Sequence, residues 1–334
     1  MLRAASIGLG WWSDELAGAI QGKSESIQVV SCFSRSAEKR QAFAEKFGTA
    51  SHESYEALLD NPDIDAVILT TPHSQHADHV IQAARAGKQV FVEKPFTLTA
   101  ESGQAAAQAC AQAGVVLAVG HNRRFSAAAQ ALEAMLEAGE FGTVLHLEAN
   151  FSAPGGLRYT PDRWRANRVE SPGGAIAGLG IHMIDLLTSL AGPVTRVSAS
   201  VARRAVEVEI DDTTAALLTF ESGASGYLGT HFACPYTSFL NIYGTKANAF
   251  AAVDASELRV HVAGGSAEAR LLEPVDTLKL ELEEFAAACA GGPAFRVRPD
   301  EAIHNVAVME AIVASATEGS AAISLETTAL AQPA

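Results

Sequence analysis

The sequence has little cysteine and no long hydrophobic run. It contains four cysteines in 334 residues, and their scattered positions (Cys32, Cys110, Cys234, Cys289) match no metal-ligand spacing. We therefore expect reduced thiols, no disulfide framework and no bound metal. No apolar run reaches the ~20 residues that span a bilayer, and the N-terminal segment lacks the layout of a signal peptide. These absences predict a cytoplasmic protein without membrane contact.

Positive charge is also scarce. Lys and Arg number 24 against 38 Asp and Glu, which gives a formal net charge of -14. A chain this acidic is not expected to bind nucleic acid or an anionic membrane. Hydrophobic residues make up 48% of the sequence, as in ordinary globular proteins, and the length favours two domains with sizeable cores.

A glycine-rich turn follows the first predicted strand. Residues Leu2–Ile7 predict a buried strand, and Gly8-Leu9-Gly10-Trp11-Trp12-Ser13 comes directly after it. This is the spacing of a dinucleotide-binding turn with serine in the third glycine position. Gly8 would permit the tight turn, and Gly10 would let a pyrophosphate approach the N-terminus of the following helix. Residues 15–20 are apolar enough to form that helix.

The first 120 residues alternate between strands and helices. Further strands are predicted at Ile27–Phe33, 65–70, 88–93 and 115–119. Helices are predicted at Ala37–Phe47 and 53–59, from an N-cap at Ser74 to Ala86, and from an N-cap at Thr99 to Ala113. Regular βα alternation is typical of a doubly wound parallel sheet with right-handed crossovers.

The loop after the second strand bears on the choice of cofactor. Dinucleotide folds commonly carry an acidic residue there for the ribose 2′-hydroxyl, whereas this chain has Ser34-Arg35-Ser36. Hydroxyl groups and a guanidinium suit a 2′-phosphate, so we favour NADP, with NAD possible. The alternative is a solvated loop arginine with no ligand.

A charged pair stands at the end of another buried strand. Glu93-Lys94-Pro95 follows Gln89–Val92, and ligands of open α/β sheets bind outside the carboxyl ends of the strands. Pro95 restricts the backbone of Lys94, so the ammonium group can be aimed at a fixed point. The alternative interpretation is a solvated salt bridge that caps the strand.

The pattern changes after Arg124. A helix at 126–138, a strand at 144–151 and a helical segment at 173–191 are predicted. Alternating runs at 196–201, Thr213–Phe220, 224–232, 239–243 and 258–262 suggest a mostly antiparallel sheet. Helices at Thr277–Cys289 and 299–316 end the chain.

The long loop at 152–172 is rich in arginine. It holds Arg158, Arg163, Arg165 and Arg168, together with Tyr159 and Trp164. Structureless loops of this length in compact domains are usually functional. Guanidinium groups bind carboxylates and aromatic rings stack, so an anionic or aromatic-derived substrate is one interpretation. Surface ion pairs or subunit contacts are the other.

Several motifs occur together in the order seen in one family. They are Gly8-Leu9-Gly10, Thr71-Pro72 with His76, Glu93-Lys94-Pro95, Asn122-Arg123-Arg124-Phe125, and Gly173-Gly174 with His182 and Asp185. Over nearly its whole length the chain resembles the glucose-fructose oxidoreductase, inositol dehydrogenase and MocA family (Gfo/Idh/MocA). The resemblance implies a Rossmann domain at 1–122 and an α/β substrate domain at 123–334, whose open sheet commonly joins dimers or tetramers. It also implies hydride exchange between NAD(P) and a carbinol carbon of a sugar-like, cyclic polyol or dihydrodiol substrate.

Some site residues follow from the same resemblance, and the others follow from the residue patterns described above. Lys94 and His182 match the catalytic positions: an ammonium can stabilise an alkoxide, and an imidazole can exchange the proton near neutral pH. The predicted cofactor contacts are Gly8, Gly10, Trp11, Trp12, Ser34, Arg35, Thr71, Pro72, His73, His76, Glu93, Lys94 and Asn122. The predicted substrate contacts are Lys94, Arg123, Arg163, Trp164, His182 and Asp185.

One position departs from the family. Sugar-active members usually carry an aspartate four residues before the histidine, and this chain has Gly178. In a helix that aspartate would share a face with the histidine, so its absence weakens an inositol or glucose assignment. Two alternatives stay open. One is an NAD-linked sugar or inositol dehydrogenase, and the other is a catalytically silent dinucleotide-binding sensor or partner subunit.

Overall fold

The computed structural model describes residues 1–252 and 256–326, and it divides into two compact units. The first comprises Met1–Asn122 and Asp276–Ile303, and the second comprises Arg123–Val275 and the chain from His304. Segment Asp276–Ile303 thus lies in the first unit, whereas the sequence analysis placed it in the second domain. Aromatic packing explains the difference, because the rings of Phe285 and Phe295 lie 5.8 Å and 6.4 Å from that of Phe91 in the first unit.

The first unit is built on a six-stranded parallel sheet, as predicted. Its order is β3-β2-β1-β4-β5-β6. The strands are β1 (Leu2–Ile7), β2 (Ile27–Phe33), β3 (Ala50–Ser51), β4 (Ala66–Leu69), β5 (Gln89–Glu93) and β6 (Leu117–Gly120). Strands β4 and β5 are nearly continuous apolar runs, since helices cover both faces of the sheet.

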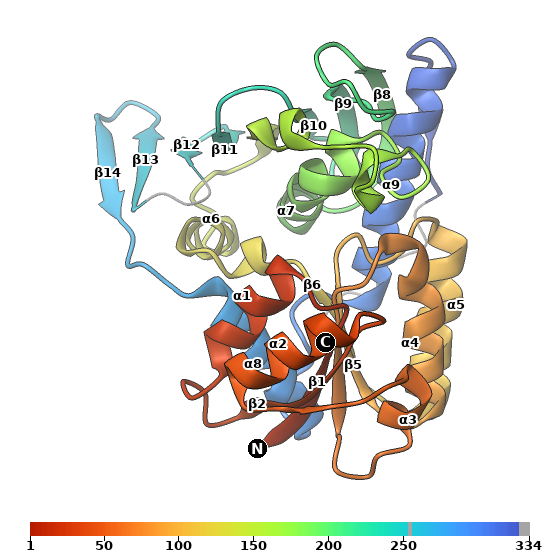
Figure 1. Cartoon of the computed structure of the whole chain (residues 1–334). Helices are drawn as coiled ribbons and strands as arrows, with labels where there is room; N and C mark the ends of the chain where they lie inside the picture. The colour runs from red at the N-terminus through yellow and green to blue at the C-terminus, as the bar shows by residue number, and fades with distance from the viewer. Residues whose placement is uncertain (253–255, 327–334) are drawn as a thin grey trace. The chain divides into compact units, whose positions relative to one another are not determined.

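Helices flank this sheet on two sides (Figure 1). On one side lie α1 (Trp11–Ile20), α2 (Ala37–Phe47) and α8 (Thr277–Cys289), and on the other α3 (Tyr55–Leu59), α4 (His76–Arg85) and α5 (Ala100–Ala113). The predicted cap at Thr99 is confirmed, because its hydroxyl accepts from the Ser102 N–H. The predicted cap at Ser74 is wrong. Residues His73–Gln75 form a 3-10 turn, and α4 begins only after Gln75.

The second unit contains a nine-stranded sheet in the order β14-β13-β12-β11-β7-β10-β9-β8-β15. Strands β7 and β10 pair in parallel and the other neighbours are antiparallel, so the predicted fold class is confirmed. The strands are β7 (Val144–Ser152), β8 (Val194–Ala202), β9 (Thr213–Phe220), β10 (Ser225–His231), β11 (Thr237–Gly244), β12 (Ala247–Ala251), β13 (Glu257–Val262), β14 (Ala267–Leu271) and β15 (Ile323–Ser324).

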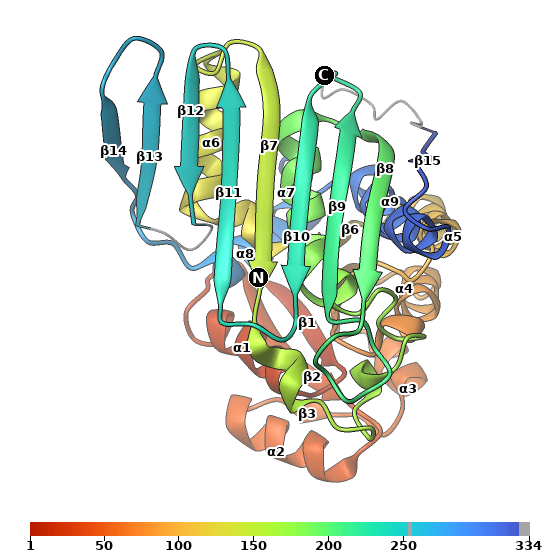
Figure 2. The same cartoon turned by 90° about the horizontal axis from the view of Figure 1, so that it is seen from above.

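Helices cover one face of this sheet. Figure 2 shows α6 (Ala127–Glu137) and α7 (Ile181–Ala191) behind the strands, and α9 (Pro299–Thr317) runs into this unit from residue 304. Helix α7 is preceded by a π-helical turn, Ile176–Gly180, which the sequence did not predict. Among the described residues, no helix combines the length and apolarity needed to cross a bilayer.

Candidate active site

The turn after β1 has the geometry that a dinucleotide requires. Gly8 adopts φ 91°, and a side chain there would lie 2.7 Å from the Thr71 backbone nitrogen, so only glycine fits. A Cβ atom at Gly10 would meet no atom within 4 Å, so space is open beside the start of α1. The turn thus fits a pyrophosphate, which approaches a helix N-terminus closely.

Ser13 holds this turn in place. Its buried hydroxyl accepts from the Gly10 N–H at 2.8 Å and donates to the Gly10 carbonyl at 2.7 Å. Because Gly10 N–H is occupied, the first N–H groups that α1 can offer an anion are those of Trp11 and Trp12. Among the described residues, the buried indole N–H of Trp12 has no hydrogen-bond partner. A buried donor without an acceptor is costly, which is consistent with a ligand contact there.

Basic side chains gather after β2. Arg35 is exposed, and the hydroxyl of Ser36 caps α2 by accepting from the Lys39 N–H. Arg40, which the sequence analysis did not single out, donates to the Ser34 carbonyl at 2.7 Å. A basic residue one turn inside the helix after the loop is the signal that could have found it. Ser34, Arg35 and Arg40 therefore lie on one loop and the adjoining helix turn.

The loop after β4 is joined to the end of β5 by His76. Its fully buried ring nitrogens lie 2.9 Å from the Pro95 carbonyl oxygen and 3.0 Å from the Thr71 carbonyl oxygen. Burial lowers the pKa of this ring to about 4, so it is neutral. Both ring nitrogens already face backbone oxygens, so His76 acts on a bound dinucleotide only through the loops it joins. His73 is buried beside it, after Pro72.

Glu93 and Lys94 end strand β5. Glu93 is buried, and its Oε2 accepts from the Lys94 backbone N–H at 3.2 Å. Lys94 is half-buried, and its peptide bond to Pro95 is cis. Asn122, after β6, donates from its side-chain amide to the Thr277 hydroxyl at 3.2 Å. A buried carboxylate therefore holds the strand end, and Lys94 extends from it.

His182 lies in the second unit, on the first turn of α7. Its buried ring is 6.0 Å from that of Phe151, which also contacts Arg123 at 4.0 Å and Tyr236 at 6.0 Å, measured to ring centroids. Arg123, predicted to contact substrate, is thus brought together with His182 around one aromatic ring. The sequence analysis missed Phe151 and Tyr236, because nothing in the local pattern separates them from core residues.

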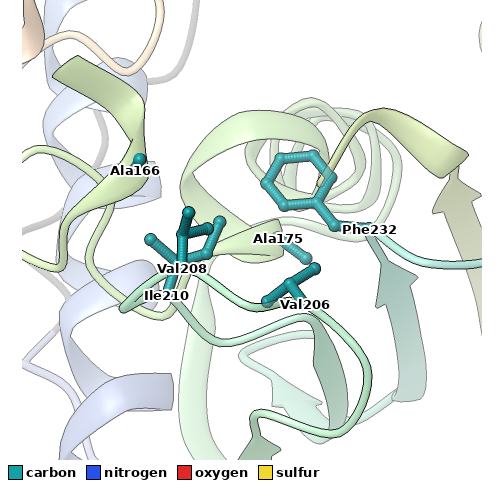
Figure 3. Packing of buried hydrophobic residues seen from close by; sticks show 6 residues of the cluster. All are labelled: Ala166, Ala175, Val206, Val208, Ile210 and Phe232. Atoms are coloured by element: carbon teal, nitrogen blue, oxygen red, sulfur yellow. The ribbon is translucent and has the colours of Figure 1, made fainter. Parts of the chain in front are cut away.

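The position of the family aspartate is filled from a distant strand end. A side chain at Gly178 would lie 2.3 Å from Cζ of Phe232, so the Phe232 ring occupies that space. Gly178 also sits within the π-helical turn, where the i, i+4 relation of a regular helix no longer holds strictly. Figure 3 shows Phe232 with its buried apolar neighbours Ala166, Ala175, Val206, Val208 and Ile210. Tyr159 of the 152–172 loop packs against the same cluster.

Asp185, a predicted substrate contact, has structural partners within the second unit. Its carboxylate is fully buried and accepts from Arg124 at 2.8 Å and 3.0 Å and from the Asn305 amide at 2.9 Å. A carboxylate with these partners holds α7 to its neighbours and has little capacity left for a ligand. We therefore assign Asp185 to the support of α7.

The loop arginines have different surroundings. Arg165 stacks on the Trp164 ring at 3.9 Å, and Arg168 pairs with Asp211 at 3.0 Å. Arg158 and Arg163 are exposed and form no ion pair with the described part of the chain. Of the predicted substrate contacts in this loop, Arg163 is thus the one whose charge is available.

Comparison with known proteins identifies the family. Residues 2–121 match the oxidoreductase family GFO_IDH_MocA with its NAD-binding Rossmann fold, and residues 129–250 match the GFO/IDH/MocA C-terminal domain. The chain belongs to the Gfo/Idh/MocA family. It is therefore an oxidoreductase that uses a nicotinamide dinucleotide, as predicted.

Three relatives of this family member cover almost its whole length. D-xylose 1-dehydrogenase (NADP⁺) 2 of Haloferax volcanii is 29% identical, over 91% of this chain and 93% of its own. A solved structure assigned as an NADPH-dependent oxidoreductase, from Desulfitobacterium hafniense, is 34% identical with TM-score 0.90 and 97% of both chains covered. The WlbA dehydrogenase of Bordetella pertussis, solved with NADH and UDP-GlcNAcA, is 27% identical with TM-score 0.87 and 98% of both chains covered.

Proposed function

We propose that the protein is an NADP-preferring dehydrogenase or reductase that moves hydride between the nicotinamide and a carbinol or carbonyl carbon. The observation that carries the proposal is the end of β1, where Gly8 is forced against Thr71 and open space adjoins the start of α1. The Glu93-Lys94 pair ends a strand of the same sheet. Gly8, Gly10, Trp11, Trp12, Thr71 and Pro72 would hold the pyrophosphate region.

The preference for NADP is supported by the loop after β2. It carries Ser34, Arg35 and, one turn into α2, Arg40, with no acidic residue before Glu38. A 2′-phosphate gains charge-assisted hydrogen bonds from guanidinium groups, whereas the 2′-hydroxyl of NAD gains little from them. An NAD-linked sugar or inositol dehydrogenase is the alternative in which these arginines are incidental.

The proposed chemistry divides between Lys94 and His182. A bound nicotinamide would supply the hydride acceptor for oxidation or the donor for reduction. We assign to Lys94 the stabilisation of negative charge that develops on the substrate oxygen. We assign to His182 the exchange of the hydroxyl proton, because an imidazole titrates near neutral pH.

The surroundings of His182 support a particular class of substrate. Phe151 borders the histidine, and Tyr236 packs against Phe151. The Phe232 ring fills the space of the hydrogen-bonding aspartate of sugar-active members. An aromatic wall favours a ring with an apolar face, such as a cyclic dihydrodiol or a sugar derivative with few hydroxyl groups. The available charge of Arg163 favours an anionic form of that substrate.

The second unit supports assembly into a homo-oligomer, a dimer or tetramer. The face of the nine-stranded sheet opposite α7 exposes Leu217, whose side chain is 61% accessible. We propose that this face contacts a second copy, in the way the family resemblance implies. Sedimentation velocity of the wild type and of Leu217→Glu measures the effect. The substitution should shift the protein to a smaller species, and an unchanged sedimentation coefficient would place the contact elsewhere.

A catalytically silent sensor is the alternative of another class. The presence of both Lys94 and His182 favours the enzyme, because a protein that only binds the dinucleotide needs neither proton exchange nor alkoxide stabilisation. The discriminating experiment is a panel of sugars, cyclic polyols and cis-dihydrodiols, each beside its carboxylated form. Turnover with NADP and with NAD is followed by nicotinamide absorbance. Binding of cofactor with no turnover across the panel, in either direction, would favour the sensor.

A further inference from the structure

A second acidic residue lies behind the strand end that carries Lys94. Glu281 and Phe285 stand four residues apart on α8, so they share one face of the helix. Phe91 and Glu93 stand two residues apart on β5 and share one face of the strand. The rings of Phe91 and Phe285 pack at 5.8 Å. The charge of Glu93 acts on Glu281, which agrees with Glu281 lying on the side of α8 that faces β5.

Glu281 is fully buried, and among the described residues no donor lies within hydrogen-bond distance of either of its carboxyl oxygens. An ionised carboxylate in such a place would be strongly destabilising, whereas a protonated one is tolerated. The charged groups that act on it offer no compensation. They are Glu93 on β5 and Asp276 at the N-terminus of α8, and both are acidic.

Among the described residues, helix α1 and strand β2, which pack against α8, bring no available cation either. On α1, Asp14 is paired with Lys46 and Glu15 is exposed, and β2 contains no charged residue. Burial, followed by the charges of Glu93 and Asp276, raises the pKa of Glu281 well above its ordinary value of 4.5. Both effects favour the neutral form of the carboxyl group.

Glu93 is the acceptor to which a neutral Glu281 can donate a hydrogen bond. Its Oε2 accepts from the Lys94 N–H, and its Oε1 lies over Gly120 of β6, where a side chain would come within 2.8 Å of it. Gly120 thus leaves room for the carboxylate, and α8 places Glu281 on the same side of β5. We propose that Glu281 is a positioning residue, a neutral acid that donates its hydrogen to Glu93 and so fixes the strand end from which Lys94 extends.

The proposal has a direct consequence for stability. In the unfolded chain Glu281 ionises above about pH 4.5, whereas in the folded chain it keeps its proton. The folded state then binds one proton more than the unfolded state, so stability falls as pH rises above that value. Relative to Glu281→Gln, which has no proton to lose, the unfolding equilibrium constant of the wild type should rise about tenfold per pH unit until the folded group titrates.

Denaturant unfolding between pH 5 and 8 tests this consequence without any substrate. In a Trp164→Phe background the remaining tryptophans, Trp11 and Trp12, report on the first unit. Glu283→Gln on the same helix is the matched control, since Glu283 is partly exposed and near Lys279. We expect the wild type and the Glu283 variant to share one pH slope and Glu281→Gln to be flatter. Parallel slopes for all three proteins would overturn the proposal.

Turnover tests whether Glu281 affects Lys94. This measurement, unlike the unfolding experiment, rests on the proposed function. Glu281→Gln keeps a hydrogen-bond donor for Glu93, whereas Glu281→Leu has similar size and no donor. We expect Glu281→Leu to lower kcat about tenfold more than Glu281→Gln, with the cofactor dissociation constant little changed. Equal losses in the two variants would remove the positioning role, even if the pH slopes show a buried neutral acid. If no substrate is turned over, the unfolding arm still decides the protonation state.

Discussion

Each unit has a fully buried carboxyl group near its proposed catalytic residue, Asp185 near His182 and Glu281 near the strand end of Lys94. The two groups differ in their hydrogen-bond and charge partners. Asp185 lies one turn after His182 on α7, and its oxygens accept three hydrogen bonds from Arg124 and Asn305. Glu281 on α8 has no such partner among the described residues, and the charges near it are acidic. Burial is the same in both cases. The partner therefore decides whether a buried acid serves the fold as a charge or as a neutral hydrogen donor.

The same distinction separates the arginines. Arg124 and Arg168 are committed to Asp185 and Asp211 within the second unit. Arg35 and Arg163 are exposed and form no ion pair with the described part of the chain. Charged groups with internal partners hold elements together, and those without partners are the ones available to ligands. Each prediction below tests one side of this comparison.

The largest effect is expected from removing a committed partner. Asp185→Ala removes the carboxylate that pairs with the buried guanidinium of Arg124, so the free energy of unfolding should fall by about 3–5 kcal/mol. Asp185→Asn, which keeps an acceptor for Asn305, should lose less. Chemical denaturation at neutral pH measures both variants. An Asp185→Ala protein as stable as the wild type would contradict the claim that Asp185, unlike Glu281, stabilises the fold as a charged partner.

A smaller effect is expected from the available arginine of the 152–172 loop. If Arg163 contacts the substrate, a carboxylated substrate should be preferred over its neutral analogue by about 2–3 kcal/mol, or roughly 30- to 150-fold in kcat/KM. Arg163→Ala should remove that preference, and Arg158→Ala, an exposed neighbour, serves as the control. Neutral and carboxylated substrates turning over equally well would assign Arg163 to the surface or to a subunit contact.

Arg35, the available arginine of the first unit, should contribute about 1.5–3 kcal/mol to the binding of NADP. Arg35→Ala should raise the dissociation constant for NADP roughly 10- to 100-fold and leave that for NAD nearly unchanged. Lys39→Ala on the same helix tests whether general positive charge is sufficient. Titration calorimetry with both cofactors gives the answer. Equal losses for NADP and NAD, or tighter binding of NAD by the wild type, would favour the NAD-linked alternative.

Local sequence patterns were sufficient to predict many helices and strands of the first unit. The bounds of β1, β2, α2 and α5 agree with the predicted ranges, because apolar periodicity and caps such as Thr99 are properties of neighbouring residues. The failure at Ser74 has a local cause, since Pro72 is extended and leads into a 3-10 turn before α4 begins. Strands β12 and β14 were missed because small or charged residues weaken their alternation.

Long-range contacts explain what the sequence could not show. Position 178 must be glycine because the ring of Phe232, 54 positions away, fills the space of a side chain. Asp185 accepts a hydrogen bond from Asn305, 120 positions away. Neither partner has a motif around it. Likewise Glu281 resembles an ordinary helix-surface residue until the packing of Phe285 on Phe91 turns its face toward β5. Motifs predicted the residues that we propose to approach ligands, and packing showed the residues that hold their surroundings in place.

The most direct test of the account is the turnover of Lys94→Ala, His182→Ala and the double variant with the best substrate, beside their cofactor dissociation constants. We expect each single variant to lose about 10²–10⁴-fold in kcat while cofactor binding is largely kept. We expect the double variant to lose much less than the product of the two, because both residues act in one step. Full turnover in either single variant would contradict the assignment of that residue.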